Sequence, residues 1–343
     1  MITVDAYCHL GDCCIYETTV GETELVAALD ANRVSAVIVQ PFPGAPNPVE
    51  VHDRIARLGG KHPGRVFGVA NATPHIDRDR YHREIERCVK ELGFVGVALN
   101  TLGHVVNPNG RDARTVFEVA RELSIPIVVE TGWGVPFGLP SALLGRAREY
   151  SDVKIVLSPA GAGPYIQEAF VLARECSNVY VSTPWCRGVD VKWLIDELGA
   201  SRVLLGSDLP SNLEAELAKY RSLGLFYFQQ YQVLGQNAID VFGLKGVTEY
   251  VEPTPNVEPA AAPVEVTAPV SGEDTAEEPV SATDHQEPGG DAEAAAEAPG
   301  EARATEAPAE AAGQIAAESE DRDGRDGSGE PTSPAEGVPA EKV

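Results

Sequence analysis

The chain opens with the segment Val4-Asp5-Ala6-Tyr7-Cys8-His9-Leu10-Gly11, which has the pattern of a short buried strand that ends in polar side chains. Further short apolar runs rich in Val and Ile follow it, and such runs are typical of parallel strands that are buried on both faces. The last of them lies in Arg202-Val203-Leu204-Leu205-Gly206-Ser207-Asp208-Leu209-Pro210. The strands predicted in this way are residues 2–8, 36–41, 65–70, 94–100, 125–131, 154–158, 179–183 and 203–207.

Segments with helical apolar spacing separate these strands. Asn47, Asp77 and Asn212 precede three of the segments and are predicted N-caps. The strict alternation of strands and helices predicts an α/β protein built as a (β/α)8 TIM barrel. A doubly wound open sheet is the alternative, but the sequence lacks the Gly-rich first turn that is typical of it. The predicted helices are residues 22–32, 48–61, 78–92, 113–123, 141–149, 165–175, 190–198 and 213–222, with a last helix at about 228–242 that closes the barrel bottom or side.

The composition changes sharply near Tyr250 and divides the chain into two parts. Residues 251–343 contain no Phe, Trp or Tyr, and they hold 23 of the 52 acidic residues but only 4 of the 27 basic ones. A segment of this kind cannot bury enough apolar surface to offset the entropy of ordering it. We therefore predict a TIM-barrel domain over residues 1–246 and a disordered, acidic, Ala/Glu/Pro-rich tail over residues 247–343. The tail is either a solubilising segment or a docking arm for a basic partner.

The sequence disfavours several functional classes. No apolar stretch approaches the ~20 residues that span a bilayer, and Met1 leads into a strand without the pattern of a secretory signal. The six Cys residues lack paired C-x-x-C spacing and are interpreted as mostly reduced thiols. The acidic balance argues against nucleic-acid binding. We expect a cytoplasmic protein whose ligand is a small molecule, with neither nucleic acid nor a membrane as a partner.

Three motifs carry a resemblance to a known family over residues 1–244. They are Asp5-Ala6-Tyr7-Cys8-His9 in the first strand, Gly206-Ser207-Asp208-Leu209-Pro210 after the eighth, and the ending Gly235-Gln236-Asn237-Ala238 to Gly243-Leu244. Together they resemble the amidohydrolase-related (amidohydrolase 2 type) family of metal-dependent hydrolases. The resemblance implies a site at the carboxyl ends of the barrel strands. It also implies hydrolysis or non-oxidative decarboxylation of a small molecule, and pairing into a homodimer.

The metal ligands that the resemblance implies are partly replaced. Where the family has His-x-His at the end of the first strand, this chain has Tyr7 and His9. Where the family has His on the fifth and sixth strands, this chain has Glu130 and Pro159, and Asp208 keeps the Asp of the eighth strand. The resemblance therefore gives His9, Glu130 and Asp208 as the metal-binding and catalytic residues. In the family the strand-eight Asp accepts a proton from metal-bound water.

The altered ligand set leaves three hypotheses open. The first is a rebuilt site in which His9, Glu130 and Asp208, with Tyr7 as a fourth ligand, hold one divalent metal ion. That ion is Zn²⁺, as in the family, or Mn²⁺ or Mg²⁺, which suit oxygen-rich ligand sets better. The second is metal-free acid–base chemistry by Glu130 and Asp208, with His9 or Tyr7 as proton donor. The third is a catalytically inactive barrel that binds a ligand or an assembly partner at its mouth.

Each strand-end residue also has a plain structural alternative. The pleat of the first strand predicts that Asp5, Tyr7 and His9 share one face and that Cys8 points to the helices. His9 is then either a ligand or a hydrogen-bonded core histidine. Glu130 is costly to bury without a partner, so His9, Arg187 or a cation is expected beside it.

Four further strand-end residues are predicted to bind substrate or else to pack the loops: Tyr7, Asn100, Trp133 and Trp185. A loop histidine is more often solvated than catalytic, and a lone Gly-x-Gly turn is a weak indication of a phosphate site. The weaker candidates of these two kinds are His75, His104 and Gly161-Ala162-Gly163.

Overall fold

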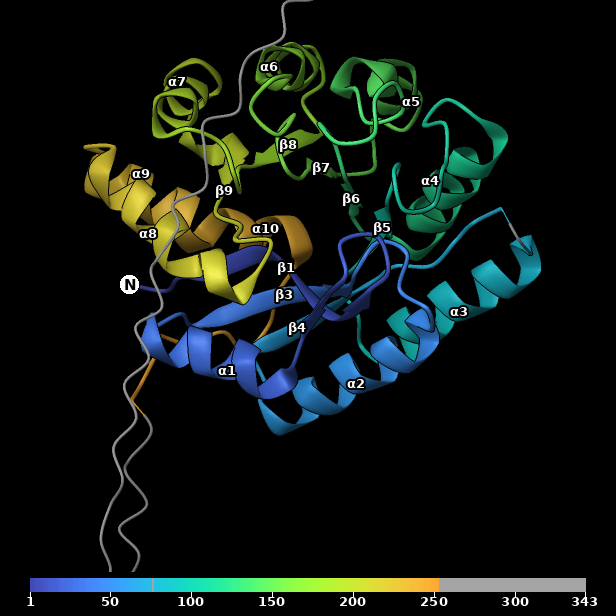
Figure 1. Ribbon diagram of the computed structural model, residues 1–343. Coiled ribbons are helices and arrows are strands. Elements are labelled where there is room, and N and C mark those ends of the chain that lie inside the picture. The colour runs from blue at the N-terminus through green and yellow to red at the C-terminus, as the bar shows by residue number, and fades with distance from the viewer. Residues whose placement is uncertain (76, 253–343) are drawn as a thin grey trace, which may run out of the picture. The chain divides into compact units, whose positions relative to one another are not determined.

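The computed structural model describes residues 1–75 and 77–252. The predicted barrel domain falls within this range, apart from position 76, whereas the predicted disordered tail lies outside the described residues from position 253 onward. In the described part, strands alternate with helices and lie side by side in a curled sheet that the helices surround (Figure 1). The predicted fold class is confirmed.

Eight parallel strands form the barrel within the described residues. Each pairs with the next in chain order, from β1 to β3 and onward to β9. The ring closes between β9 and β1, because Ala6 N donates to Leu205 O at 2.9 Å and Asp208 N donates to Tyr7 O at 2.8 Å. The barrel strands are β1 (Val4–Cys13), β3 (Ala36–Pro41), β4 (Val66–Ala70), β5 (Gly96–Leu99), β6 (Ile127–Val129), β7 (Ile155–Leu157), β8 (Val179–Ser182) and β9 (Val203–Leu204).

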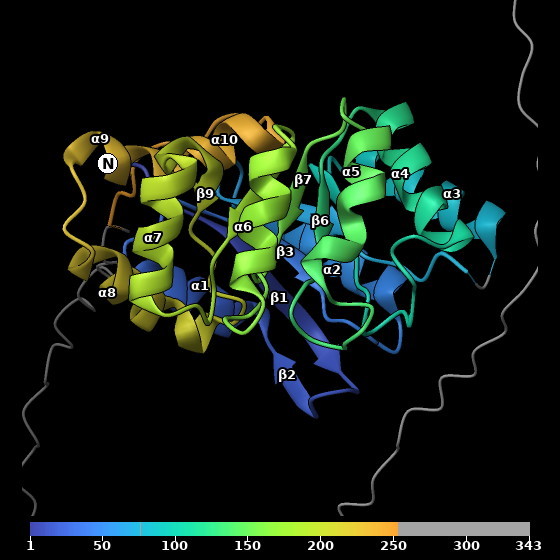
Figure 2. The ribbon, with the colours of Figure 1, turned by 90° about the horizontal axis from the view of Figure 1, so that it is seen from above.

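The helices lie around the outside of this ring (Figure 2). Their bounds agree with the predicted segments to within a few residues. The helices that follow the strands are α1 (Glu22–Ala31), α2 (Pro48–Lys61), α3 (Arg78–Lys90), α4 (Arg111–Leu123), α5 (Leu144–Glu149), α6 (Ile166–Glu175), α7 (Gly188–Leu198) and α8 (Leu213–Ser222). Short 3-10 turns are η1 (Pro140–Leu143), η2 (Ala200–Arg202) and η3 (Pro210–Asn212).

The last predicted helix is three consecutive pieces, α9 (Tyr227–Tyr231), the π-helical turn η4 (Gln232–Gln236) and α10 (Asn237–Phe242). Apolar side chains of α10, such as Phe242, pack with residues of the barrel interior. Asn237 donates to Val203 O at 2.7 Å, where β9 begins. Because this contact is at the amino end of the strand, α10 closes the bottom of the barrel and the carboxyl end stays open.

The first strand contains a bulge that changes which way its side chains point. The pairing of β1 with β3 shifts register between Asp5 and Cys8. Val4, Ala6 and Tyr7 therefore all belong to the inner apolar cluster, while Cys8 packs in the outer layer against the helices, as predicted. The prediction that Asp5 shares a face with Tyr7 was wrong, because the extra residue of a bulge breaks the alternation of sides.

The first strand also continues beyond its predicted end at Cys8. It runs to Cys13, turns, and pairs antiparallel with β2 (Thr18–Val20), where Thr19 Oγ1 donates to Asp12 Oδ1 at 2.8 Å. Figure 2 shows this hairpin projecting from the barrel. The hairpin matters for function because its turn carries Tyr16 to the open end of the barrel.

Two of the three predicted N-caps make the expected capping hydrogen bond. Asn47 accepts from Glu50 N at 3.4 Å and Asp77 accepts from Arg80 N at 2.9 Å. Asn212 stands at the N-cap position of α8 as predicted but makes no capping bond, since its amide donates instead to Ser207 O, at 2.9 Å, and steadies the turn after β9. Across residues 1–75 and 77–252, every helix is too short or too polar to cross a bilayer. All six Cys residues are described, and none is in a disulfide.

Candidate functional site

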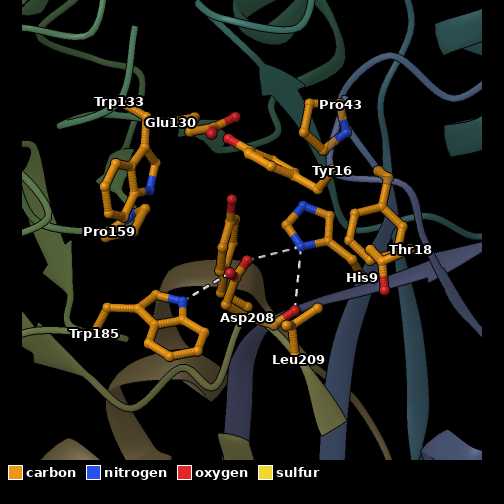
Figure 3. A pocket seen from close by; sticks show the side chains of 12 residues that line it. His9, Tyr16, Thr18, Pro43, Glu130, Trp133, Pro159, Trp185, Asp208 and Leu209 are labelled. Atoms are coloured by element: carbon orange, nitrogen blue, oxygen red, sulfur yellow. Dashed lines mark hydrogen bonds and ion pairs between the residues drawn. The ribbon is translucent and has the colours of Figure 1, made fainter. Parts of the chain in front are cut away.

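A pocket of about 350 Å³ lies at the carboxyl ends of the barrel strands (Figure 3). It brings together side chains from strands that are far apart in the sequence. Asn100 does not line the pocket but is buried directly behind Glu130, to which it donates a hydrogen bond. The other predicted site residues all line it: Tyr7, His9, Glu130, Trp133, Trp185 and Asp208.

His9 is held on both ring nitrogens and on its face. Its Nδ1 lies 2.9 Å from Asp208 Oδ1, and its Nε2 lies 3.0 Å from the amide nitrogen of Gln40. Phe42 stacks on the imidazole with ring centres 4.8 Å apart, and Tyr7 meets it edge-on. Burial alone would lower the pKa of His9, but the hydrogen bond and charge of Asp208 outweigh it and raise the pKa. His9 is therefore held in a fixed orientation and paired with Asp208.

The Gln40 amide can adapt to the charge of this imidazole. Its Oε1 finds no hydrogen-bond partner among the described residues. If the amide is turned over, Oε1 accepts from Nε2 of a protonated His9, so both protonation states of the ring are satisfied.

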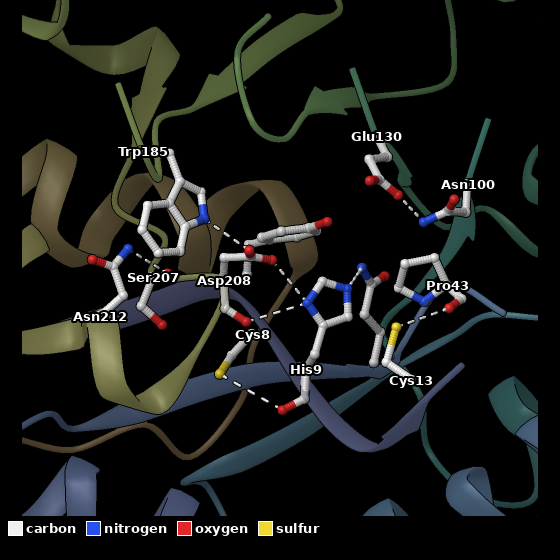
Figure 4. Close-up of polar contacts among 12 residues, drawn as sticks. Cys8, His9, Cys13, Pro43, Asn100, Glu130, Trp185, Ser207, Asp208 and Asn212 are labelled. Carbon is white, nitrogen blue, oxygen red and sulfur yellow. Dashed lines mark hydrogen bonds and ion pairs between the residues drawn. The ribbon is translucent and has the colours of Figure 1, made fainter. Parts of the chain in front are cut away.

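Both carboxylate oxygens of Asp208 are engaged (Figure 4). Oδ1 pairs with His9, and Oδ2 accepts from the indole nitrogen of Trp185 at 2.8 Å. Asp208 and Trp185 have φ values of 69° and 63°, a left-handed conformation that residues with side chains seldom adopt. The side chain of Asp208 faces the pocket instead of capping the loop that follows it (Figure 3).

Glu130 is a buried acid with a neutral partner. Its side chain is almost fully covered, and Asn100 donates to one oxygen while Asn100 Oδ1 accepts from Gly103 N at 2.5 Å. Burial raises the pKa of Glu130 to about 8, with the charge of His9 opposing this shift and that of Asp208 adding to it. Arg187, one of the predicted partners, pairs instead with Asp190 at 2.7 Å. Glu130 therefore keeps its proton at neutral pH.

A profile of the amidohydrolase family matches residues 22–244 of the chain. The chain belongs to the amidohydrolase family. No curated protein is similar enough to this amidohydrolase-family chain to be matched.

Solved structures share the fold of this amidohydrolase-family chain at low sequence identity. A 2,6-dihydroxybenzoate decarboxylase from Rhizobium has a TM-score of 0.58 at 18% identity, covering 72% of this chain and 100% of that one. A dihydroxybenzoic acid decarboxylase from Polaromonas, with bound manganese and 2-nitroresorcinol, has a TM-score of 0.58 at 19% identity. The match covers 71% of this chain and 97% of that one. A 5-carboxyvanillate decarboxylase from Sphingomonas paucimobilis has a TM-score of 0.58 at 16% identity, and the match covers 71% of this chain and 99% of that one.

The mouth residues of this amidohydrolase-family chain do not fit a bound metal ion. Metal binding by His9 needs a free lone pair on a ring nitrogen, and both nitrogens are already engaged. Pro159 contributes no ligand atom. The potential ligand atoms of His9, Glu130 and Asp208 do not all lie within 4.8 Å of one another, so the predicted metal set is not a ligand cluster in this arrangement.

Within the described residues, one group of potential metal ligands does lie close together: His52, Glu84 and Cys88, between α2 and α3. His52 Nδ1 lies 2.8 Å from Glu84 Oε1, and its Nε2 accepts from Asn71 N at 3.0 Å. Burial acts to raise the pKa of Glu84, but hydrogen bonds from His52 and Arg87 outweigh it and lower the pKa to about 2. Both ring nitrogens of His52 are hydrogen-bonded, and the Arg87 guanidinium lies beside Glu84. The cluster is therefore a hydrogen-bond network that joins two helices.

Several pocket residues were not predicted from the sequence. Phe42 and Pro43 directly follow β3, so the rule that sites gather at strand ends could have found them. Tyr16 and Thr18 belong to the hairpin. The β-branched run Thr18-Thr19-Val20 after a turn was the available indication of its second strand.

The weaker candidates lie outside this pocket. His75 is exposed, and neither it nor His104 lines the pocket. His104 is buried, and burial lowers its pKa to about 4, so it is neutral. The turn Gly161-Ala162-Gly163 precedes α6, which begins only at Ile166, and it contributes to a separate open hollow beside Arg187.

Proposed function

We propose that the mouth of this barrel binds a small organic molecule without the help of a metal ion. The observation that carries the proposal is the aromatic-lined pocket of about 350 Å³ above a fully hydrogen-bonded His9. Its volume lies in the range of ~300–1,000 Å³ that is usual for small-molecule sites. Of the three hypotheses drawn from the sequence, this geometry favours the binding barrel and the metal-free acid–base site over the rebuilt metal site.

The pocket walls suit a flat or compact organic ligand. Tyr7 and Phe42 are buried and form part of the floor, whereas Trp133 and Trp185 are 40% and 46% exposed at the rim. Aromatic walls bind apolar bodies through contact area and ring stacking. A few polar groups then fix the orientation of the ligand, and here those groups are the carboxyl groups of Glu130 and Asp208.

Decarboxylation of the kind named for the similar structures is not supported by the charges of this pocket. Those proteins are named for dihydroxybenzoate and carboxyvanillate, which carry a carboxylate on an aromatic ring. The described residues that line this pocket include no Lys or Arg. A carboxylate would therefore lie beside the ionised Asp208, and the only counter-charge, His9, is already paired with Asp208.

A second candidate function is proton transfer by Glu130. This carboxyl group lines the pocket, Asn100 fixes its orientation, and its pKa of about 8 leaves it protonated near neutral pH. A buried acid whose pKa lies near the working pH can act as a general acid and then as a general base. Hydrolysis or a related reaction of a neutral substrate would use this group without a metal.

The binding proposal is tested by screening small aromatic compounds against protein dialysed with EDTA. Saturable binding, measured by calorimetry, is expected without added metal. Tyr16→Ala should weaken it, whereas Tyr227→Ala, which removes another exposed tyrosine far along the chain on α9, should not. Binding that appears only after Mn²⁺ is added, or equal losses in both variants, would overturn the proposal. For catalysis, Glu130→Gln should retain binding and lose turnover.

A further inference from the structure

The pocket combines aromatic faces with carboxyl groups. Five aromatic side chains surround it, and Figure 3 shows Trp133 and Trp185 across the space from Tyr16 and His9. The face of an aromatic ring carries the negative part of its quadrupole, so any ring face that borders the pocket attracts a cation. The aromatic residues are Tyr7, Tyr16, Phe42, Trp133 and Trp185.

The one carboxylate of the pocket that is ionised at neutral pH, that of Asp208, has the same sign as these faces. Glu130 also lines the pocket but keeps its proton, and among the described lining residues His9 is the only basic side chain. His9 is 2% exposed and its Nδ1 lies 2.9 Å from Asp208 Oδ1, so it offers a ligand almost no surface of its own. Asp208 is less covered, with 22% of its side chain exposed towards the pocket. The accessible electrostatics therefore favour positive charge.

We infer that the ligand of this pocket is an organic cation, such as a quaternary ammonium or protonated amine on an apolar body. This inference rests on the proposed function, because it specifies the ligand class of the same site. The cationic group lies between the rim tryptophans and Tyr16, near the Asp208 carboxylate, and the apolar body rests on the floor beside Phe42. Cations over Trp and Tyr faces are attracted to the ring quadrupole, and more strongly where water is excluded.

The test compares three probes of similar size. They are benzyltrimethylammonium, its uncharged carbon analogue neopentylbenzene, and benzoate, each titrated into the full-length protein by isothermal titration calorimetry. We expect benzyltrimethylammonium to bind about tenfold more tightly than neopentylbenzene, and benzoate to bind most weakly. Benzoate binding as tightly as the cation would overturn the ligand class while leaving the small-molecule proposal in place. No binding by any of the three, together with an empty aromatic screen, would overturn both.

Two variants separate charge from shape. Asp208→Asn should reduce affinity for the cation about tenfold, as expected for loss of one partly desolvated charge interaction, and leave affinity for neopentylbenzene unchanged. Because Asp208 also holds His9, a second variant is needed in case this one misfolds. Trp133→Leu changes an exposed rim residue and should weaken binding of the cation more than binding of the neutral analogue. Equal losses for both probes in Trp133→Leu would contradict a cation site.

Discussion

The indole nitrogen of Trp185 donates to Asp208 Oδ2 at 2.8 Å, and both residues have left-handed backbone conformations. Conformations of this kind cost on the order of 1–3 kcal/mol each in residues with side chains. The bond ties the loop after β8 to the turn after β9. Together with His9 on the other oxygen, it fixes the direction of the Asp208 carboxylate.

Trp185→Phe should therefore lower the free energy of unfolding by about 1 kcal/mol, because it keeps an aromatic ring but removes the donor to a charged acceptor. Trp133→Phe is the matched control, since Trp133 is a similarly exposed rim tryptophan. We expect it to change stability by less than about 0.5 kcal/mol. Urea unfolding of both variants measures the difference. Equal stabilities would mean that the Trp185 bond contributes nothing to folding.

Glu130 should make stability fall as pH rises. In the folded protein its pKa is about 8, against an ordinary value of 4.5. Between these values the unfolded chain has released this proton and the folded chain has not, so the free energy of unfolding decreases with increasing pH. Glu130→Gln cannot titrate. Relative to wild type, we expect the free energy of unfolding of the variant to increase by on the order of 3 kcal/mol between pH 5 and pH 8.

Thermal unfolding of wild type and Glu130→Gln at several pH values checks this. Asp5 also titrates in the window, since burial raises its pKa to about 7 against opposing hydrogen bonds that include one from Ser207. Its contribution is present in both proteins and cancels in the comparison. A stability difference that stays constant from pH 5 to pH 8 would show that Glu130 is ionised in the folded protein throughout.

Glu84 should have the opposite pH dependence. Its pKa is lowered to about 2 by His52 and Arg87 in spite of partial burial. The stability it contributes is present above its ordinary value of 4.5 and is lost as pH falls towards 2. Glu84→Gln should therefore cost roughly 2 kcal/mol at pH 7, and the cost should shrink in acid. Chemical denaturation at pH 7 and pH 3 tests this, and an unchanged cost at pH 3 would refute the assignment.

Deletion of residues 253–343 should leave the melting temperature nearly unchanged. This segment contains no aromatic residue, and most of its charged side chains are acidic. A segment of that composition gains little by packing on a folded domain. Differential scanning calorimetry of the full chain and of residues 1–252 makes the comparison. A drop of many degrees on deletion would show that the tail packs against the barrel.

The barrel could be predicted from the sequence because its strands are buried on both faces. Runs such as Ala36–Pro41 are apolar throughout, and helices of regular spacing separate them, so both element type and order could be derived. The hairpin of β2 was missed because three residues of polar and β-branched type give little periodicity. The bulge at Asp5 and Cys8 was missed because no local residue pattern requires it.

The convergence of the pocket residues was predictable, but their bonding was not. Glu130 and Asp208 follow barrel strands and His9 lies near the end of the part of β1 that pairs with β3, and such positions meet at the carboxyl face. That Gln40 engages the second nitrogen of His9 depends on how neighbouring strands are staggered. Glu130 bonds to Asn100 and not to Arg187 because of the courses of the loops that carry these two residues. Neither relationship is encoded in residue spacing.

The most direct measurement is the metal content of the purified chain after incubation with excess Mn²⁺ or Zn²⁺ and gel filtration. We predict far less than one equivalent per chain, with no change in Asp208→Asn, because both nitrogens of His9 remain bonded within the protein. One equivalent of tightly held metal, present in the wild type and lost in both His9→Ala and Asp208→Asn, would contradict a metal-free mouth.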